Sequence, residues 1–160
     1  MESALRRQDK PPKPGPEVSV IRCEGGSGVR VQIISDTIWG VWTHWDGHRS
    51  RECTAEDESC IGHKSKWATR WKGYLHVWCP FRKEYCFLEL TPASAGEILR
   101  LNGSNPSLRG KLLRLDRVNG NKRAKIAVEL TSGVSNVGEL PVPQSPEPVL
   151  RRLWGWKTTD

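Results

Sequence analysis

The sequence predicts a mainly β fold of five to six short strands with one short helix. Runs of β-branched and aromatic residues alternate with polar ones along most of residues 17–131, which is typical of strands. One stretch with a helix signal lies between the run at 84–91 and the run at 109–117. A length of 160 residues suits one domain with flanking segments.

Residues 1–16 hold four prolines and mixed charges with almost nothing to bury, which predicts a disordered basic arm. The runs VSVIRC and VRVQIIS follow, separated by the turn signal GGSG, and they predict a pair of strands. The run IWGVWTHW at residues 38–45 predicts the next strand.

Residues 70–79 and 84–91 predict a hairpin with one core face and one aromatic outer face. The alternation in RWKGYLHVWC places Leu75 and Val77 toward the core, and Cys86 and Leu88 match them on the second strand. The opposite face mixes cations with aromatic rings.

Thr91 is the expected N-cap of the one short helix, because Pro92 follows at the first helical position and the apolar stripe stops at Asn102. Strands are then expected at 109–117 and 123–131, on either side of a tight Asn-Gly turn. This order of elements matches a five-stranded OB-like barrel, and a small β-sandwich is the alternative. Residues 17–135 form the expected domain.

Two segments follow that domain. Residues 136–148 read as a Pro-rich linker, and residues 149–160 as a C-terminal tail containing tryptophan. The tail either folds back onto the domain or binds a partner protein through 149–156.

Cysteine and histidine spacing predicts a zinc-binding loop inserted between strands, within residues 44–67. Cys53, Cys60 and His63 lie within eleven residues, in a polar stretch without periodicity. The fourth ligand is either His44 or His48; His44 is favoured because a strand end is fixed in space. Four protein ligands leave no open position for a catalytic water, so the expected Zn²⁺ is structural.

The motifs THW, Cys53, CIGH, RWKGYLHVW and FLELT occur in an order that resembles the zinc-containing single-stranded DNA-binding proteins of T-even bacteriophages. The resemblance covers roughly residues 30–100. It implies an OB-class barrel with an inserted zinc subdomain and a DNA cleft lined by aromatic and basic residues. It also implies that His44, Cys53, Cys60 and His63 are the ligands, although His63 stands where that family has its last cysteine.

The charge balance favours a polyanionic partner. Lys and Arg number 25 against 18 Asp and Glu, a formal charge of +7. No apolar run is long enough for a membrane span, and the N-terminus lacks the apolar centre of a signal peptide, so an intracellular protein, cytoplasmic or nucleoid-associated, is expected.

These features predict a non-enzymatic protein that binds single-stranded nucleic acid, with DNA favoured and RNA left open. Aromatic rings would stack on bases while cations contact phosphates. The alternatives are a protein-interaction module that uses the C-terminal Trp motif and, third, a metal-dependent nuclease using Asp46, His48 and Glu52. The predicted nucleic-acid-binding residues are Arg70, Lys72, Tyr74, Trp78, Tyr85, Phe87, Arg114 and Lys125.

Overall fold

The computed structural model describes residues 19–26, 28–121, 124–133 and 139–154. These residues form one mixed sheet with a few short helices, so the mainly β prediction is confirmed. The predicted N-terminal arm lies outside the described residues. The strands are β1 (Ser19–Arg22), β2 (Val29–Ile33), β3 (Trp39–Trp45), β4 (Ser50–Glu52), β5 (Ala68–Cys79), β6 (Glu84–Leu90), β7 (Leu112–Arg117) and β8 (Ile126–Thr131). The helices are α2 (Ile61–Lys64), α3 (Pro92–Asn102), the 3-10 turn η1 (Val118–Gly120) and α4 (Glu147–Leu153).

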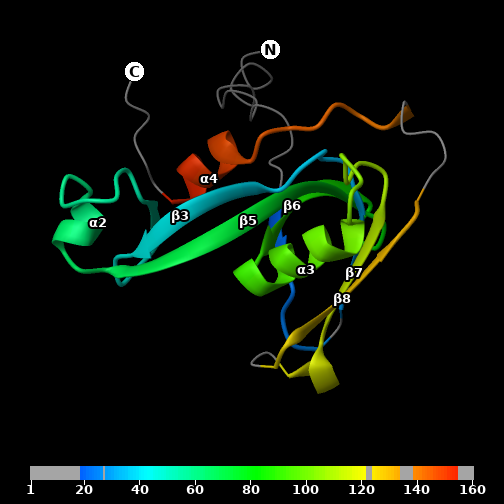
Figure 1. The fold of residues 1–160 in the computed structure, drawn as a ribbon, viewed down its shortest axis with the longest axis horizontal. Coiled ribbons are helices and arrows are strands. Elements are labelled where there is room, and N and C mark those ends of the chain that lie inside the picture. Colours follow the sequence, from blue (N-terminus) through cyan, green and yellow to red (C-terminus); the bar gives the residue numbers. More distant parts are fainter. Residues whose placement is uncertain (1–18, 27, 122–123, 134–138, 155–160) are drawn as a thin grey trace, which may run out of the picture.

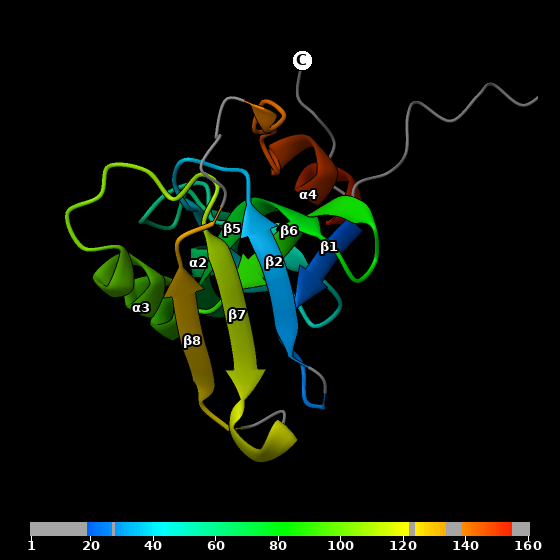
Figure 2. The same cartoon turned by 90° about the vertical axis from the view of Figure 1, so that its right-hand side faces the viewer.

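The strands β7, β2, β5 and β6 lie side by side in that order, with β8 beyond β7 (Figures 1 and 2). This is a Greek-key arrangement, because the chain returns after β6 and α3 to place β7 beside β2. Among the described residues β8 pairs only with β7 and β6 only with β5 and β1, so the sheet does not close into the expected barrel.

The first two predicted strands are present, but the expectation that they pair with each other is wrong. β1 pairs in parallel with β6, where Ser19 lies opposite Cys86, and β2 pairs with β5 and β7. The loop after β1 turns away instead, and the Gly26 amide donates to the Gly120 carbonyl at 2.8 Å. The turn signal GGSG thus leads the chain to η1 rather than reversing it into a neighbouring strand.

β5 is the central strand, and at 12 residues it is long enough for two partners on one edge. β3 pairs with its first half, from Ala68 to Tyr74, and β2 pairs with Val77 and Trp78. β6 begins its pairing at Gly73 on the other edge. Of the described strands, only β3 therefore pairs with residues 68–72, and the opposite edge of that segment is open.

The main core lies between the sheet and α3. Leu75, Val77 and Leu88 are fully buried there against Ile98 of the helix. Thr91 caps α3 as expected, since its hydroxyl accepts from the Ser94 amide at 3.1 Å. The predicted assignment of the inward-facing residues is confirmed.

A second cluster lies on the opposite face of the sheet. Leu150 and Trp154 of α4 and its cap pack there against Val41 and Tyr74. Figure 1 shows α4 above β3 and α3 on the other side of β5 and β6. The described part of the tail therefore docks onto its own domain.

A search of the described helices for a long apolar membrane-crossing segment found none.

Gly96 offers a test of the packing around α3. Its Cβ position is open, with no atom within 4 Å, and it lies in the interior of the helix. Gly96→Ala should therefore stabilise the fold by about 0.5–1 kcal/mol, because alanine loses less backbone entropy in a helix. Urea unfolding followed by circular dichroism measures this; a destabilised variant would mean that the helix packs differently.

Candidate metal centre

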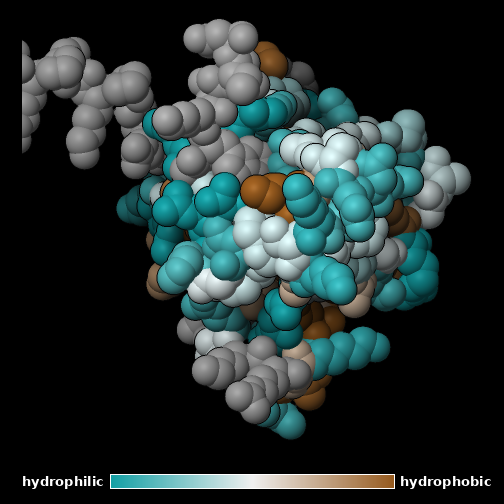
Figure 3. All heavy atoms as spheres, turned by 90° about the vertical axis from the view of Figure 1, so that its left-hand side faces the viewer, coloured by the Kyte–Doolittle hydropathy of each residue, from teal (hydrophilic) through white to brown (hydrophobic). Residues whose placement is uncertain are grey.

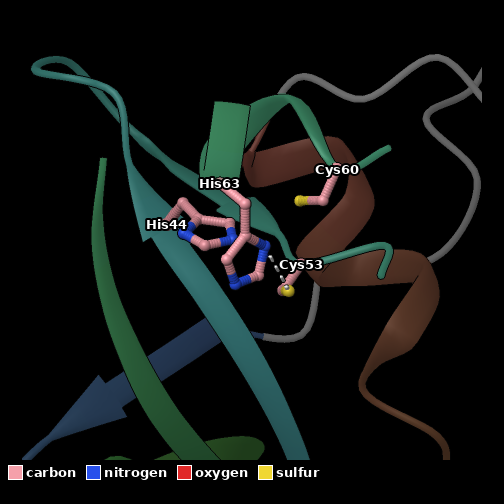
Figure 4. Close-up of side chains that lie close together, drawn as sticks. All are labelled: His44, Cys53, Cys60 and His63. Atoms are coloured by element: carbon pink, nitrogen blue, oxygen red, sulfur yellow. Dashed lines mark hydrogen bonds between the residues drawn. The ribbon is translucent and has the colours of Figure 1, made fainter. Parts of the chain in front are cut away.

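Two histidines and two cysteines meet at the end of the molecule that carries α2. His44 is near the end of β3, Cys53 follows β4, Cys60 is the N-cap of α2, and His63 lies within α2. Their four ligand atoms lie within 4.8 Å of one another (Figure 4). A bound Zn²⁺ would bring such atoms to roughly 3.3–3.8 Å apart, since its bonds to nitrogen and sulfur are about 2.0–2.3 Å long. The cluster can therefore hold a metal ion after a small contraction.

The His44 ring is oriented for ligation. Its Nδ1 lies 3.1 Å from the Thr69 hydroxyl, while its Nε2 is buried and has no hydrogen-bond partner in the described part of the chain. A buried polar atom without a partner is costly and calls for an explanation. An ion bound to Nε2 supplies one, with Nδ1–H donating to Thr69 as the second ring nitrogen of a metal-binding histidine commonly does.

The two thiols differ in acidity. Burial alone would raise the pKa of Cys60, but hydrogen bonds from the Thr54 and His63 backbone and side chains lower it to about 4. Burial and the neighbouring Cys60 raise the pKa of Cys53. The thiolate form is thus favoured at Cys60 without a cation. A bound cation would favour it at Cys53 as well, because metal ligation deprotonates a thiol.

His48 lies outside the cluster, so the structure favours His44 over the alternative. Asp46 organises the turn between β3 and β4, and its carboxylate accepts from the His48 and Arg49 amides at 2.8 Å each. Arg51 adds a bond at 2.6 Å, and these three contacts hold the pKa of Asp46 well below its usual range. The His48 side chain remains exposed.

Two of the three residues suggested for a nuclease site are engaged in other contacts. Asp46 is engaged in the turn, and Glu52 pairs with Arg151 of α4 at 3.7 Å. The three residues Asp46, His48 and Glu52 are not among those that the structure gathers into a possible metal cluster.

Gly62 allows α2 to pack closely against β3. A Cβ atom at this position would lie 2.2 Å from Cδ2 of His44. Only glycine lets the helix approach the ring this closely, so Gly62 sets the position of one ligand without ligating. Sequence reasoning missed both Gly62 and Thr69, although the CIGH spacing already placed a glycine beside His63.

Two of the predicted nucleic-acid-binding residues are not on the surface. Tyr74 is 1% exposed and Phe87 is 0% exposed. The alternation was correct in placing them opposite the main core, but α4 covers Tyr74, and Phe87 lies in a ring cluster with His76. The expectation that both rings face solvent is therefore wrong for this structure.

Most of the other predicted residues lie on the sheet face opposite the main core, as the alternation and the strand register require; these are Arg70, Lys72, Trp78, Tyr85 and Arg114. Arg70 is exposed. Trp78 packs against the partly exposed Tyr85, with ring centroids 4.7 Å apart. Lys72 is half-buried and pairs with Glu89 at 3.6 Å. Arg114 pairs with Asp116 at 2.6 Å on β7, and Lys125 is exposed before β8. Lys125 lies apart from the others, beside Glu97 of α3.

A groove beside the open edge of β5 was not predicted. It has a volume of about 590 Å³, and it contains two indoles that lie directly opposite each other, Trp42 of β3 and Trp71 of β5. Arg70 and Lys72 also line it. Trp71 has the parity of Leu75 and packs, partly buried, against the main core. Alternation along the strand could not show that its ring also lines a groove.

Cys60→Ser tests the cluster directly. The variant should lose its bound metal and loosen residues 46–67, because the free energy of binding at such a site stabilises the fold. Elemental analysis of purified protein and hydrogen exchange of the loop are the measurements. Cys79→Ala is the control, since this cysteine is also buried but lies in the main core; equal metal content in both variants would exclude the cluster as the site.

Gly62→Ala tests the close packing without removing a ligand. The added methyl group must displace the His44 ring, so metal affinity should fall by about 10–100-fold, the range seen when the support of a ligand is removed. Competition with a chromogenic chelator measures this, with Gly96→Ala as the matched control. Unchanged affinity would show that His44 is not held in place by α2.

Searches of protein-family models, of curated proteins and of solved structures found no match to this chain. The function must therefore be argued from the geometry and chemistry of its own surfaces.

Proposed function

We propose that this chain is a non-enzymatic module of the OB type that binds single-stranded nucleic acid, DNA in preference to RNA, with a structural zinc ion. The Greek-key order of β7, β2, β5 and β6, with α3 following β6, supports the OB assignment. A ligand set of two cysteines and two histidines suits Zn²⁺ in a closed, structural site.

The groove beside β5 is the observation that carries the binding function. Trp42 is 56% exposed, so one of its faces is available to a base. Trp71 lies next to it, and Arg70 provides a cation at the same place. Aromatic planes and adjacent positive charge are what an unpaired polynucleotide needs, since bases stack and phosphates are neutralised.

Two glycines hold the Trp71 ring in a fixed position. A Cβ atom at Gly40 would lie 2.6 Å from Cζ2 of Trp71, and one at Gly73 would lie 2.7 Å from Cη2. The ring therefore lies against bare backbone on two paired strands. A ring that is already immobile loses little conformational entropy when a base stacks on it, which favours binding.

Zinc would act here as a crosslink. It would join β3, the residue after β4 and α2 through His44, Cys53, Cys60 and His63, in a loop that has almost no apolar core of its own. Because His44 is two residues from Trp42 on the same face of β3, the ion would also hold the end of the strand that carries the groove.

The surface near the metal-binding loop is consistent with this proposal. Figure 3 views that end of the molecule and shows a patch of neutral and hydrophobic residues surrounded by hydrophilic ones. Trp42 and Ile61 are both more than half exposed. The net charge of +7 supports an anionic ligand rather than a neutral one.

A protein-interaction module using the C-terminal Trp motif is the second candidate. Leu153 of α4 is 60% exposed, but Leu150 and Trp154 are buried against the sheet. The described apolar residues that the sequence offers to a partner are thus mostly used within the chain, so this candidate is the weaker one.

Trp42→Ala should weaken binding of an unstructured oligonucleotide by about 5- to 150-fold, since one stacked base contributes ~1–3 kcal/mol. Fluorescence titration with oligodeoxythymidine measures this, and wild-type affinity should fall as salt rises. Trp45→Ala is the matched control, because Trp45 is similarly exposed on the opposite face of β3. Equal loss in both variants, or no binding by the wild type at low salt, would contradict the proposed groove.

A further inference from the structure

Six aromatic rings form three cross-strand pairs on the sheet face opposite the main core. The centroids of Trp39 and Tyr74 are 6.1 Å apart, those of His76 and Phe87 are 5.4 Å apart, and those of Trp78 and Tyr85 are 4.7 Å apart. The pairs follow one another along β5, and each reaches across to β3 or β6. This aromatic face has the composition of a stacking surface.

The C-terminal segment covers part of this aromatic face. The Trp154 ring lies over Tyr74, with centroids 6.4 Å apart and planes inclined by 60°. Leu150 completes the contact with Tyr74 and Val41. Closer to the start of α4, the Gln144 amide donates to Nδ1 of His76 at 3.2 Å.

This covered interface contains polar groups. The Tyr74 hydroxyl donates to Glu89 at 2.9 Å, and Nε2 of His76 is buried with no partner among the described residues. An unpaired ring nitrogen is unfavourable in a permanent core but is satisfied by water or a ligand when uncovered. Burial lowers the pKa of His76, and the positive charge of the nearby Arg109 lowers it further. Both effects keep the ring neutral.

Contacts to the β3–β4 hairpin help to hold the cover in place. Arg151 pairs with Glu52 at 3.7 Å, and Arg49 donates to the Trp154 carbonyl at 3.4 Å. A helix of seven residues is too short to be stable alone, so α4 depends on such contacts and on its apolar side. Release of α4 would leave the α3 side of the sheet intact, because the two clusters share no residue.

We propose that α4 is a removable cover on a second single-strand-binding surface, the aromatic face, and that Trp154 occupies the space of a base over Tyr74 until nucleic acid displaces it. This inference rests on the proposed function and names the regulation of its binding surface. Four of the residues predicted to stack lie on this face: Tyr74, Trp78, Tyr85 and Phe87. The groove at Trp42 is open in the covered form, and the aromatic face would extend the bound length when α4 leaves.

Trp154→Ala removes the ring that covers Tyr74. Arg151→Glu replaces two ion pairs by charge repulsion, the pair with Glu52 across the interface and the pair with Glu147 within α4. Both variants should bind a long oligodeoxythymidine at least about fivefold more tightly than the wild type, the gain from about one additional stacked base, and should occupy more nucleotides per protein. Leu153→Ala, an exposed residue of the same helix, should match the wild type. Adding Glu52→Arg to Arg151→Glu should bring binding back toward the wild-type value, because it restores the pair across the interface but not the Glu147 pair within α4.

Fluorescence titration with oligodeoxythymidine of increasing length gives affinity and site size, and thermal unfolding by circular dichroism shows which variants are folded. If Trp154→Ala fails to fold, the proposal is tested by Arg151→Glu, alone and combined with Glu52→Arg. Folded variants whose affinity and site size equal those of the wild type would contradict the proposal that α4 is a removable cover, but would not contradict the proposed binding groove. Absence of binding by the wild type and by every variant would overturn the cover and the proposed function together.

Discussion

The fold depends on the alternation of side chains along β5. Successive residues of a strand point to opposite faces, so this one strand contributes Leu75 and Val77 to the main core and Tyr74 and His76 to the aromatic face. Its length lets β3 and β2 share one edge while β6 takes the other. The part of β5 that extends beyond β6 keeps an open edge, and the groove with Trp71 lies there. The proposed binding surfaces are therefore consequences of one strand that is longer than its neighbour.

The metal cluster and the cover meet at β4. Cys53 directly follows this strand, and Glu52, its last residue, pairs with Arg151 of α4. β4 is only three residues long and pairs with β3 alone among the described strands. A strand this short has little stability of its own, so its position depends on what lies at either end. An ion at the cluster would thus stabilise the docking of α4 without touching it, and docking of α4 would stabilise ion binding to the same extent, because coupling between two sites is reciprocal.

Local sequence signals predicted the parts of the structure that depend on neighbouring residues. The Thr91 cap, the β5–β6 hairpin and the inward face of each long strand follow from propensity and alternation within a few residues. The grouping of Cys53, Cys60 and His63 was also readable, because these residues are close in sequence. The choice of His44 over His48 needed one further consideration, that a side chain at a strand end is fixed while one in a polar turn is not.

The sequence alone could not predict which surface is covered by a segment that is distant along the chain. Tyr74 alternates as an outward residue in the sequence and does lie opposite the main core, yet Trp154, 80 positions later, removes it from solvent. Trp71 is a second case, since it has the parity of a core residue and packs against the core, yet it is only partly buried and lines the groove. Alternation determines the face to which a residue points, and only the tertiary partner determines whether that face is buried. A strand that carries aromatic residues on both faces is therefore the place where inferring exposure from pattern fails. Under the proposed function it is also the place where a covering helix would change which surface is available to nucleic acid.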